Sequence, residues 1–406
     1  MTWLPPLERL TTDQTYAVQA STDRPLILRG GPGSGKTIVL LHRARQLGLL
    51  TGRPDKVAVL VYTNVLKDFL RSALPELGLE EETVLTFDHW CRLRYLELIG
   101  PPPVDKQGHP DFSHIRKGLL SRLSKGSTTP LLDVALVDEG QDLDDDCYAL
   151  LRLSARHVTV AFDLKQSLYR EAGESSIRHA LGSAAREIDL QATYRACPYV
   201  VDLACEFIAD ADEKEAFRTM AATLQTERQT PLLYLAADEA DERHRLVEIL
   251  RERLLRNERV AILFPTFAQV GLFAEFLRTQ GILAAPQPQT DLKGRRTPLD
   301  FASGRPAVLT YHSAKGLTFD TVLMPGVTRT AIRARHTSAR RMLFVAITRA
   351  THWAYLSSVA STCNETVLTA LRSLQSRRRG LVQTKSDLPR KAPPPAPTPR
   401  KDWTDI

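Results

Sequence analysis

Eight residues near the N-terminus match the phosphate-binding loop pattern G-x-x-x-x-G-K-[ST]: Gly30, Gly31, Pro32, Gly33, Ser34, Gly35, Lys36 and Thr37. Glycines let backbone N–H groups approach phosphate oxygens, and a helix that starts at the end of such a loop adds a positive dipole. We expect Lys36 to reach the β- and γ-phosphates and the Thr37 hydroxyl to bind Mg²⁺. Apolar runs at 25–28 and 38–41 predict the flanking strand and helix. The sequence therefore predicts a nucleoside triphosphate site.

Two adjacent carboxylates supply the other groups that hydrolysis needs. Asp138 and Glu139 follow a second apolar run, 134–137, which reads as a buried strand. Asp138 at the end of this strand would hold Mg²⁺ through water, and Glu139 would polarise the attacking water. A structural alternative is that the two acids cap and begin a helix. Their order and their separation from the loop favour hydrolysis instead.

The elements that must position these residues alternate between short apolar runs and helical patterns. Helices are predicted at 242–255, with an apolar face, and at 267–280, ending before Gly281. This alternation predicts two consecutive parallel α/β units, at 1–190 and 191–375, of which only the first carries the phosphate loop. The predicted strands are 25–29, 57–62, 83–87, 131–137, 158–162, 187–190, 231–236, 259–264, 306–311, 320–324 and 353–357.

Composition narrows the class of protein. The chain has 406 residues, 43% of them hydrophobic, which is enough for two or three domain cores. Its five cysteines have no metal-ligand spacing, so they are expected to be reduced core residues. Neither a membrane-spanning apolar run nor a signal-peptide pattern is visible in the sequence. We expect a cytoplasmic protein with no membrane partner.

Positive charge is concentrated late in the chain. Residues 287–349 carry eleven Lys and Arg against three acids, and residues 376–406 carry eight against three. Such stretches on an otherwise mildly acidic body suit a polyanion, although a solvated basic face explains them equally well. The second stretch is also rich in proline, so 376–406 is predicted to be a disordered tail.

Eight segments beside the phosphate loop resemble, in order, the motifs of superfamily 1A DNA helicases of the UvrD/Rep type. They are 10–14, 61–64, 86–90, 138–142, 162–169, 192–195, 310–317 and 341–350. The resemblance implies two tandem RecA-like domains with ATP at their interface. It also implies a compact form, because the segments at about 91–130 and 284–306 are too short for the large 1B and 2B insertion domains of longer relatives.

The resemblance also assigns roles to individual residues. The catalytic residues would be Lys36, Glu139, Gln166, Arg195 and Arg349, with Gln166 linking the γ-phosphate to DNA and both arginines contacting that phosphate. Beyond the loop 30–37, the implied ATP contacts are Gln14, Tyr194 and Gly316, and the implied Mg²⁺ ligands are Thr37 and Asp138. The implied nucleic-acid contacts are Tyr62, Thr63, Asn64, Thr86, His89, Trp90, Tyr169 and His312.

Some of these residues have structural alternatives, and some positions depart from the family pattern. Trp90 is equally well explained as a core aromatic, and His312 as a strand-end histidine with satisfied hydrogen bonds. Gly140 stands where the family usually has alanine, and Ile38 where it often has an arginine that stacks beneath adenine. The departure at Ile38 concerns recognition of the base and does not touch hydrolysis.

The implied function is an ATP-dependent motor that hydrolyses ATP on single-stranded nucleic acid, taken as DNA, and translocates 3′ to 5′. Unwinding would be aided by a partner, since the short insertions offer little surface to grip a duplex. Two alternatives stay open. One is a DNA-stimulated regulatory ATPase or sensor that works with a nuclease. The other is an RNA-directed helicase, because nothing in the sequence identifies a contact to a 2′-hydroxyl.

Overall fold

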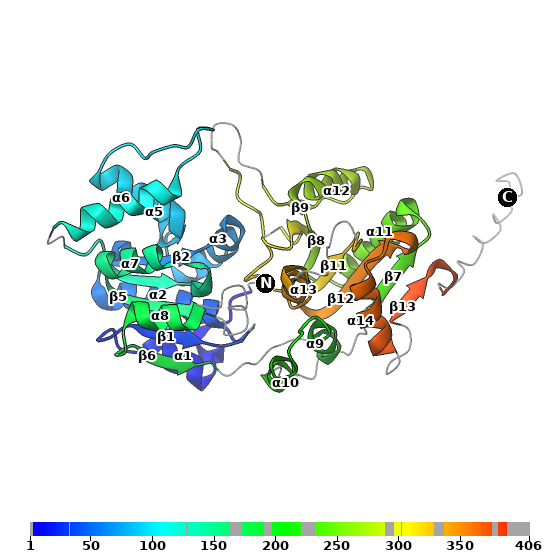
Figure 1. Ribbon diagram of the computed structural model, residues 1–406, viewed down its shortest axis with the longest axis horizontal. Helices are drawn as coiled ribbons and strands as arrows, with labels where there is room; N and C mark the ends of the chain where they lie inside the picture. Colours follow the sequence, from blue (N-terminus) through cyan, green and yellow to red (C-terminus); the bar gives the residue numbers. More distant parts are fainter. Residues whose placement is uncertain are drawn as a thin grey trace, which may run out of the picture.

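The computed structural model of the 406-residue chain describes two α/β lobes side by side (Figure 1). The described residues are 3–31, 33–126, 129–162, 173–190, 197–220, 232–288, 296–301, 303–328, 337–375 and 381–387. Each lobe is built on one sheet, and all strand pairs within the two sheets are parallel. The predicted fold class, two tandem parallel α/β units, is confirmed.

The first sheet has six strands in the order β3-β2-β4-β5-β1-β6. Its strands are β1 (Leu26–Arg29), β2 (Val57–Val61), β3 (Val84–Thr86), β4 (Leu132–Val137), β5 (Ala155–Phe162) and β6 (Arg186–Asp189). Its helices are α1 (Thr12–Gln19), α2 (Lys36–Thr51), α3 (Asn64–Arg71), α4 (Leu74–Leu77), α5 (Phe87–Leu98), α6 (Phe112–Ser124), α7 (Asp145–Ser154) and α8 (Gly173–Leu181).

Side-chain alternation places these helices on both faces of the first sheet. Leu26 and Leu28 pack in the same cluster as α1 to α4, whereas Ile27 between them packs with α5 to α8. Strands buried on both faces read as continuous apolar runs, which is why the sequence predicted them to within a few residues. The carboxyl ends of β1 and β4 therefore meet at one edge, where the loop and the two carboxylates follow.

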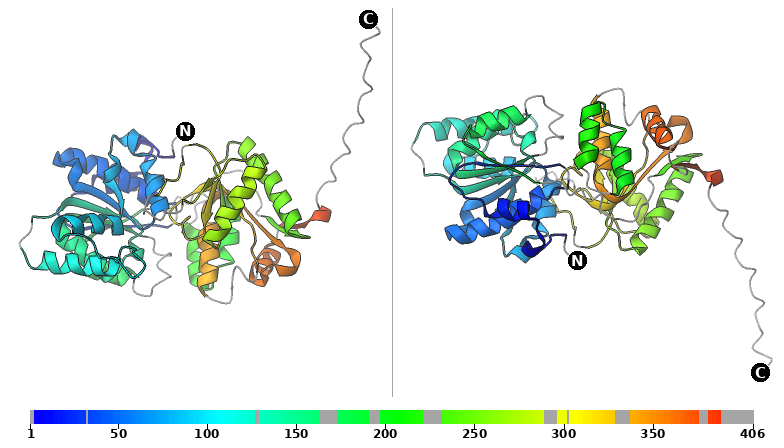
Figure 2. Two further views of the ribbon diagram at one scale, coloured as in Figure 1. Left: turned by 90° about the horizontal axis from the view of Figure 1, so that it is seen from above. Right: turned by 90° about the horizontal axis from the view of Figure 1, so that it is seen from below.

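The second sheet has seven strands in the order β13-β7-β12-β11-β8-β10-β9. Its strands are β7 (Leu232–Ala236), β8 (Val260–Phe264), β9 (Ala285–Pro286), β10 (Ala307–Thr310), β11 (Phe319–Met324), β12 (Ala350–Val359) and β13 (Val382–Thr384). Its helices are α9 (Pro198–Cys205), α10 (Ala211–Met220), α11 (Glu239–Leu255), α12 (Phe267–Thr279), α13 (Thr337–Ile347) and α14 (Glu365–Gln375). Helices α11 and α12 cover one face, and α9, α13 and α14 cover the other (Figure 2).

The end of the second sheet corrects one prediction. The sequence analysis assigned all of 376–406 to a disordered tail, but residues 381–387 form β13 and a short 3₁₀ helix. Leu381 is 1% exposed, and its carbonyl accepts a hydrogen bond of 2.7 Å from the backbone N–H of Leu233. Burial of Leu381 and pairing with the edge of β7 hold this segment in place. The prolines and arginines around it are typical of disordered chain, so the sequence did not predict this strand.

The two predicted short insertions have different structures. Within 91–130 the chain completes α5 and forms α6, and these helices pack together through residues such as Cys91, Ile115 and Leu119. Within 284–306 the described residues form β9 and an extended segment, 296–301, that lies against α3. No helix among the described residues is long and apolar enough to cross a bilayer.

Candidate ATP site at the interface of the two sheets

The phosphate loop runs from the end of β1 to the start of α2. Gly33 and Gly35 have φ values of 74° and 84°, in the left-handed region that favours glycine. Gly30 is also sterically required, because a Cβ there would overlap the Ser34 hydroxyl. Ser34 is fully buried, so the loop is packed against the body of the lobe. The backbone therefore has the cradle shape that the sequence pattern predicts.

Helix α1 supports this loop through Gln14. The Gln14 side chain donates to the Ser34 carbonyl at 3.0 Å and accepts from the backbone N–H of Thr11 at 3.0 Å, within a capping box. A Cβ on Gly35 would overlap the Gln14 amide. Lys36 Nζ donates to the carbonyls of Gly30 and Gly31, at 2.9 Å each. The side chains of Gln14 and Lys36, both predicted nucleotide contacts, thus donate to backbone carbonyls of the loop.

Thr37 and Asp138, the two residues expected to bind Mg²⁺, contact each other. The Thr37 hydroxyl donates to Asp138 Oδ2 at 2.6 Å. Burial, which disfavours a charged side chain, raises the pKa of Asp138 to about 6, and the negative charge of the neighbouring Glu139 adds to this effect. One carboxylate and one hydroxyl fit Mg²⁺, which keeps several waters and takes its other ligands from phosphates.

Glu139 is held in an unusual conformation at the end of β4. Its φ of 53° is left-handed, and its carboxylate accepts a hydrogen bond from the Gln141 amide. Burial alone would raise the pKa of Glu139, but the opposing positive charges of Lys315, Lys36 and Arg349 outweigh it and lower the pKa. An ionised, buried carboxylate beside the metal ligand suits a residue that orients and deprotonates water.

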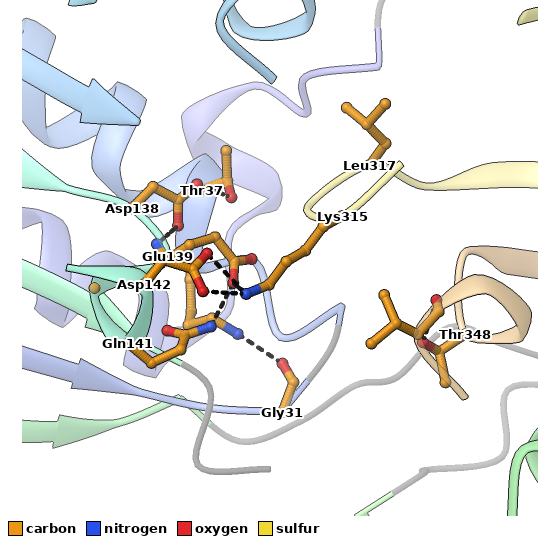
Figure 3. A network of polar contacts seen from close by, with 12 residues as sticks. Gly31, Thr37, Asp138, Glu139, Gln141, Asp142, Lys315, Leu317 and Thr348 are labelled. Atoms are coloured by element: carbon orange, nitrogen blue, oxygen red, sulfur yellow. Dashed lines mark hydrogen bonds and ion pairs between the residues drawn. The ribbon is translucent and has the colours of Figure 1, made fainter. Parts of the chain in front are cut away.

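The loop after β10 brings the second lobe to these carboxylates. Lys315 Nζ lies 3.7 Å from Glu139 Oε2 and donates to the two Asp142 oxygens at 2.7 and 2.8 Å. Figure 3 shows Lys315 extending from this loop toward Glu139 and Asp142. Next to it, Gly316 has a φ of 80°, and a Cβ there would come within 3.1 Å of Leu66 on α3. Glu139 and Asp142 of the first lobe therefore lie at the interface with the second lobe.

Arg349 lies at the end of α13, on the same side of the interface. It is 3% exposed and donates to the carbonyls of Val345 and Leu317, at 2.9 and 3.2 Å, and to the Thr348 hydroxyl at 3.2 Å. These acceptors belong to the second lobe. Arg349 is thus fixed against the loop that carries Lys315, and its charge reaches Glu139.

The unusual Gly140 has a packing explanation. A Cβ at this position would overlap Val160 and lie 2.8 Å from the Tyr148 hydroxyl. That hydroxyl donates to the Gly140 carbonyl at 2.7 Å. Tyr148 on α7 therefore braces the chain directly after Glu139 and leaves no room for alanine.

Comparisons with known proteins agree with this two-lobe site. A family model described as an AAA domain matches residues 14–172, which include the phosphate loop and both carboxylates. A model of the UvrD-like helicase C-terminal domain matches residues 307–357, which include Lys315 and Arg349. Together the two matches support a UvrD-like superfamily 1 helicase. A search of curated proteins gave no match.

One solved helicase structure shares the fold over most of this chain. The DEAD-box helicase Mss116 bound to single-stranded RNA and UDP-BeF is 14% identical, with a TM-score of 0.52 over 92% of this chain and 75% of the other. The C-terminal domain of a possible DNA helicase from Lactobacillus plantarum WCFS1 is 16% identical over 48% of this chain and 99% of that domain, with a TM-score of 0.33. The first match confirms the predicted architecture of two RecA-like α/β domains.

Two aromatic candidates for nucleic acid lie near each other, one from each lobe of the helicase. Tyr62, at the end of β2, is 49% exposed, and its ring centroid lies 6.4 Å from that of His312, after β10. Thr63 and Thr86 instead cap α3 and α5 by accepting from backbone N–H groups. Asn64 accepts a hydrogen bond from Lys67 at 3.1 Å.

Two other candidates lie on α5. Burial and the charges of Lys67, Arg92 and Arg71 lower the pKa of His89, so this imidazole lies in a positive environment. Trp90 is 2% exposed and packs near Phe87, with 6.0 Å between ring centroids. The core interpretation therefore holds for Trp90, and this residue does not face solvent. Several candidates lie outside the described residues: Pro32, Gln166, Tyr169, Tyr194 and Arg195.

Sequence reasoning missed several residues that complete this helicase site. It included Asp142 and Lys315 in motifs but assigned them no role. It gave no role to Leu66 or Tyr148, whose contacts depend on packing between distant segments. A signal for Lys315 was available, because it precedes the expected nucleotide contact Gly316 in a loop from the other lobe.

Proposed function

We propose that this chain is an ATP-driven motor that hydrolyses ATP when single-stranded DNA is bound and translocates 3′ to 5′ along it. The observation that carries the proposal is the position of Lys315 and Gly316, from the second lobe, against Glu139 and Asp142 of the first. A site shared between two lobes can change their relative position when the charge bound there changes.

The chain's own residues account for the hydrolytic step. Lys36 and the loop amides would bind the phosphates, while Thr37 and Asp138 would hold Mg²⁺, which supplies charge neutralisation when bound. Glu139 would take the proton of the attacking water, since its lowered pKa keeps it ionised. Lys315 is then poised to respond to the γ-phosphate, because the phosphate and the two carboxylates compete for its charge.

The same two segments support coupling to a single strand. Tyr62 lies two residues before the start of α3, which carries Leu66, and His312 lies three residues before Lys315. Bases stacked on Tyr62 and His312 would bring the β2–α3 and β10–β11 connections together. The ATP site would close by the same movement, because Leu66 and Gly316 already meet there.

The direct test is ATP hydrolysis measured with no nucleic acid, with single-stranded DNA and with single-stranded RNA of equal length. We expect strong stimulation by DNA. Equal or greater stimulation by RNA would favour an RNA-directed helicase, for which the Mss116 structure with single-stranded RNA offers a parallel. No stimulation by either nucleic acid would refute the motor proposal.

The short insertions suggest limits on unwinding. A helical pair, α5 and α6, and the segment 296–301 stand where longer relatives have two large domains. We therefore propose that the isolated chain translocates on single strands but separates duplexes poorly without a partner such as a nuclease. Strand displacement on a 3′-tailed duplex, run beside a single-strand translocation assay, tests this. Efficient unwinding of long duplexes by the monomer would disprove it, and stimulation without translocation would favour a regulatory ATPase.

A further inference from the structure

We propose that Asp68 and Arg296 form a latch between the two lobes and act as positioning residues for the loop that carries Lys315 and Gly316. We call residues 296–301 the strap. The latch is a property of the fold, and its effect on ATP hydrolysis rests on the function proposed above. Figure 1 shows the strap as a yellow segment between α3 and the second lobe.

The latch begins with a buried carboxylate on α3. The Asp68 side chain is 2% exposed, and Arg296 Nη2 lies 2.6 Å from Asp68 Oδ2. The backbone N–H of Leu299 donates to the same oxygen at 2.9 Å. Both partners come from the strap, which leads into β10 of the second lobe. Buried carboxylates are uncommon unless they are paired, so the Asp68 side chain depends on the strap for its ion pair and hydrogen bond.

Aromatic packing extends the contact along α3. Phe301 of the strap meets Phe69 edge-on, with 5.2 Å between ring centroids. Trp3 stacks on Phe69 at 4.2 Å and donates to the Ser72 hydroxyl at 3.1 Å. Leu299 of the strap, two residues before Phe301, is 5% exposed. The strap is therefore docked on the first lobe by an ion pair, a backbone hydrogen bond and apolar burial.

The position of the latch connects it to the ATP site. Leu66, which Gly316 contacts, lies two residues before Asp68 on α3. The strap ends at 301, β10 begins at Ala307, and the loop with Lys315 follows β10. Helix α3 is thus contacted by the strap, which precedes β10, and by the loop with Gly316, which follows β10. Holding two parts in their working arrangement removes much of the entropy cost of bringing them together. The latch should therefore make closure on a single strand easier without changing the chemistry.

The variant must remove both charges. Changing Asp68 alone would leave Arg296 unpaired beside Lys67 and Arg71, and such an uncompensated buried charge destabilises proteins strongly. Asp68→Asn with Arg296→Gln leaves no net charge and keeps an acceptor for the Leu299 N–H. The matched control is Glu81→Gln, which removes the ion pair of Arg71 on the same helix within the first lobe.

The first measurement is independent of activity. All five native cysteines are buried, so dyes will attach to Leu49→Cys and Leu272→Cys, which replace side chains that are 74% and 75% exposed on different lobes. We expect single-molecule energy transfer to show a broader and longer distance distribution in the double variant than in the unaltered protein or the Glu81→Gln control. An unchanged distribution would overturn the latch.

The second measurement separates positioning from a general structural defect. The double variant should need about fivefold more single-stranded DNA for half-maximal ATP hydrolysis, with kcat at saturation unchanged. A fall in kcat with no change in the half-saturating concentration would overturn the positioning role. If no nucleic acid stimulates the unaltered protein, the proposed function fails, and the energy-transfer result alone decides on the latch.

Discussion

Lys315 Nζ lies 2.7 Å from Oδ1 and 2.8 Å from Oδ2 of Asp142, so a cation of the second lobe is bound by a carboxylate of the first. Burial raises the pKa of Asp142, and the charge of Lys315 opposes that rise. Asp142 lies three residues after Glu139 in the chain, and Lys315 Nζ is 3.7 Å from Glu139 Oε2. Anything that draws Lys315 away changes both the contact between the lobes and the charge around Glu139.

Removing Lys315 should change the pH dependence of hydrolysis. Lys315 is the largest of the charges that lower the pKa of Glu139, so Lys315→Met should raise that pKa. Glu139 must be ionised to accept a proton, so the acidic limb of kcat/KM should move to higher pH. Lys385→Met, which removes an exposed lysine paired with Asp241, is the control. An acidic limb in the same place for both variants would contradict the prediction.

Glu139 should be needed for turnover and not for ATP binding. Glu139→Gln keeps the size of the side chain but cannot accept the proton, so kcat should fall by about 10²-fold or more. Lys36→Ala should lose ATP binding itself, because Lys36 supplies the loop's charge. Equilibrium binding of a fluorescent ATP analogue separates the two effects. A Glu139→Gln protein with near-normal turnover would exclude this residue as the base.

Tyr62 should contribute stacking to single-strand affinity. It is exposed beside His312, and Tyr62→Ala should weaken binding of a mixed-sequence oligonucleotide by about 1–3 kcal/mol. The affinity of both proteins should fall steeply with salt, because phosphate contacts carry most of it. Fluorescence anisotropy at several salt concentrations measures both. Trp90→Phe is a useful contrast, since a buried Trp90 predicts lower stability with little direct loss of affinity.

His157 should make the fold sensitive to mild acid. Its Nε2 lies 3.1 Å from Arg43 Nη2, and burial, followed by the Arg43 charge, lowers its pKa from 6.5 to about 4. Between these values the unfolded chain binds a proton that the folded chain does not, so stability should fall as the pH drops from about 6.5 toward 4. The full effect is about 3 kcal/mol. Denaturant titrations across this range should show a weaker pH dependence for His157→Gln, and an equal dependence would refute the assignment.

Shortening the chain from its C-terminal end should leave stability unchanged until the truncation reaches β13. Removing residues 388–406 leaves β13 in place and should leave the midpoint of thermal unfolding unchanged. Removing 376–406 also deletes Leu381, whose side chain is buried and whose carbonyl pairs with Leu233. That deletion should lower the free energy of unfolding by about 2–5 kcal/mol. Equal stability of the two truncated proteins would show that β13 contributes nothing.

The sequence was sufficient where chemistry is carried by neighbours in the chain. The loop 30–37, the pair Asp138 and Glu139, and the buried strands are all recognisable from local spacing and continuous apolar runs. The hydroxyl contact between Thr37 and Asp138 followed from these, because parallel strands end at one edge.

Contacts between distant segments could not be predicted in the same way. The partners of Asp68 lie more than 200 residues away in a segment that looked like a plain insertion. The direction of Trp90 depends on how α5 rotates against the sheet, which the apolar pattern of a short helix does not determine. Gln166 and Arg195, which the helicase resemblance makes catalytic, stay predictions because they lie outside the described residues.

The side chains of Val160 and Tyr148 restrict which residue can stand at position 140. A methyl group at 140 would overlap Val160 and crowd the Tyr148 hydroxyl, so the alanine usual in the family that this chain resembles is excluded while both side chains stay in place. Gly140→Ala alone should therefore be harmful here, and it should become tolerable only when positions 148 and 160 are both made smaller.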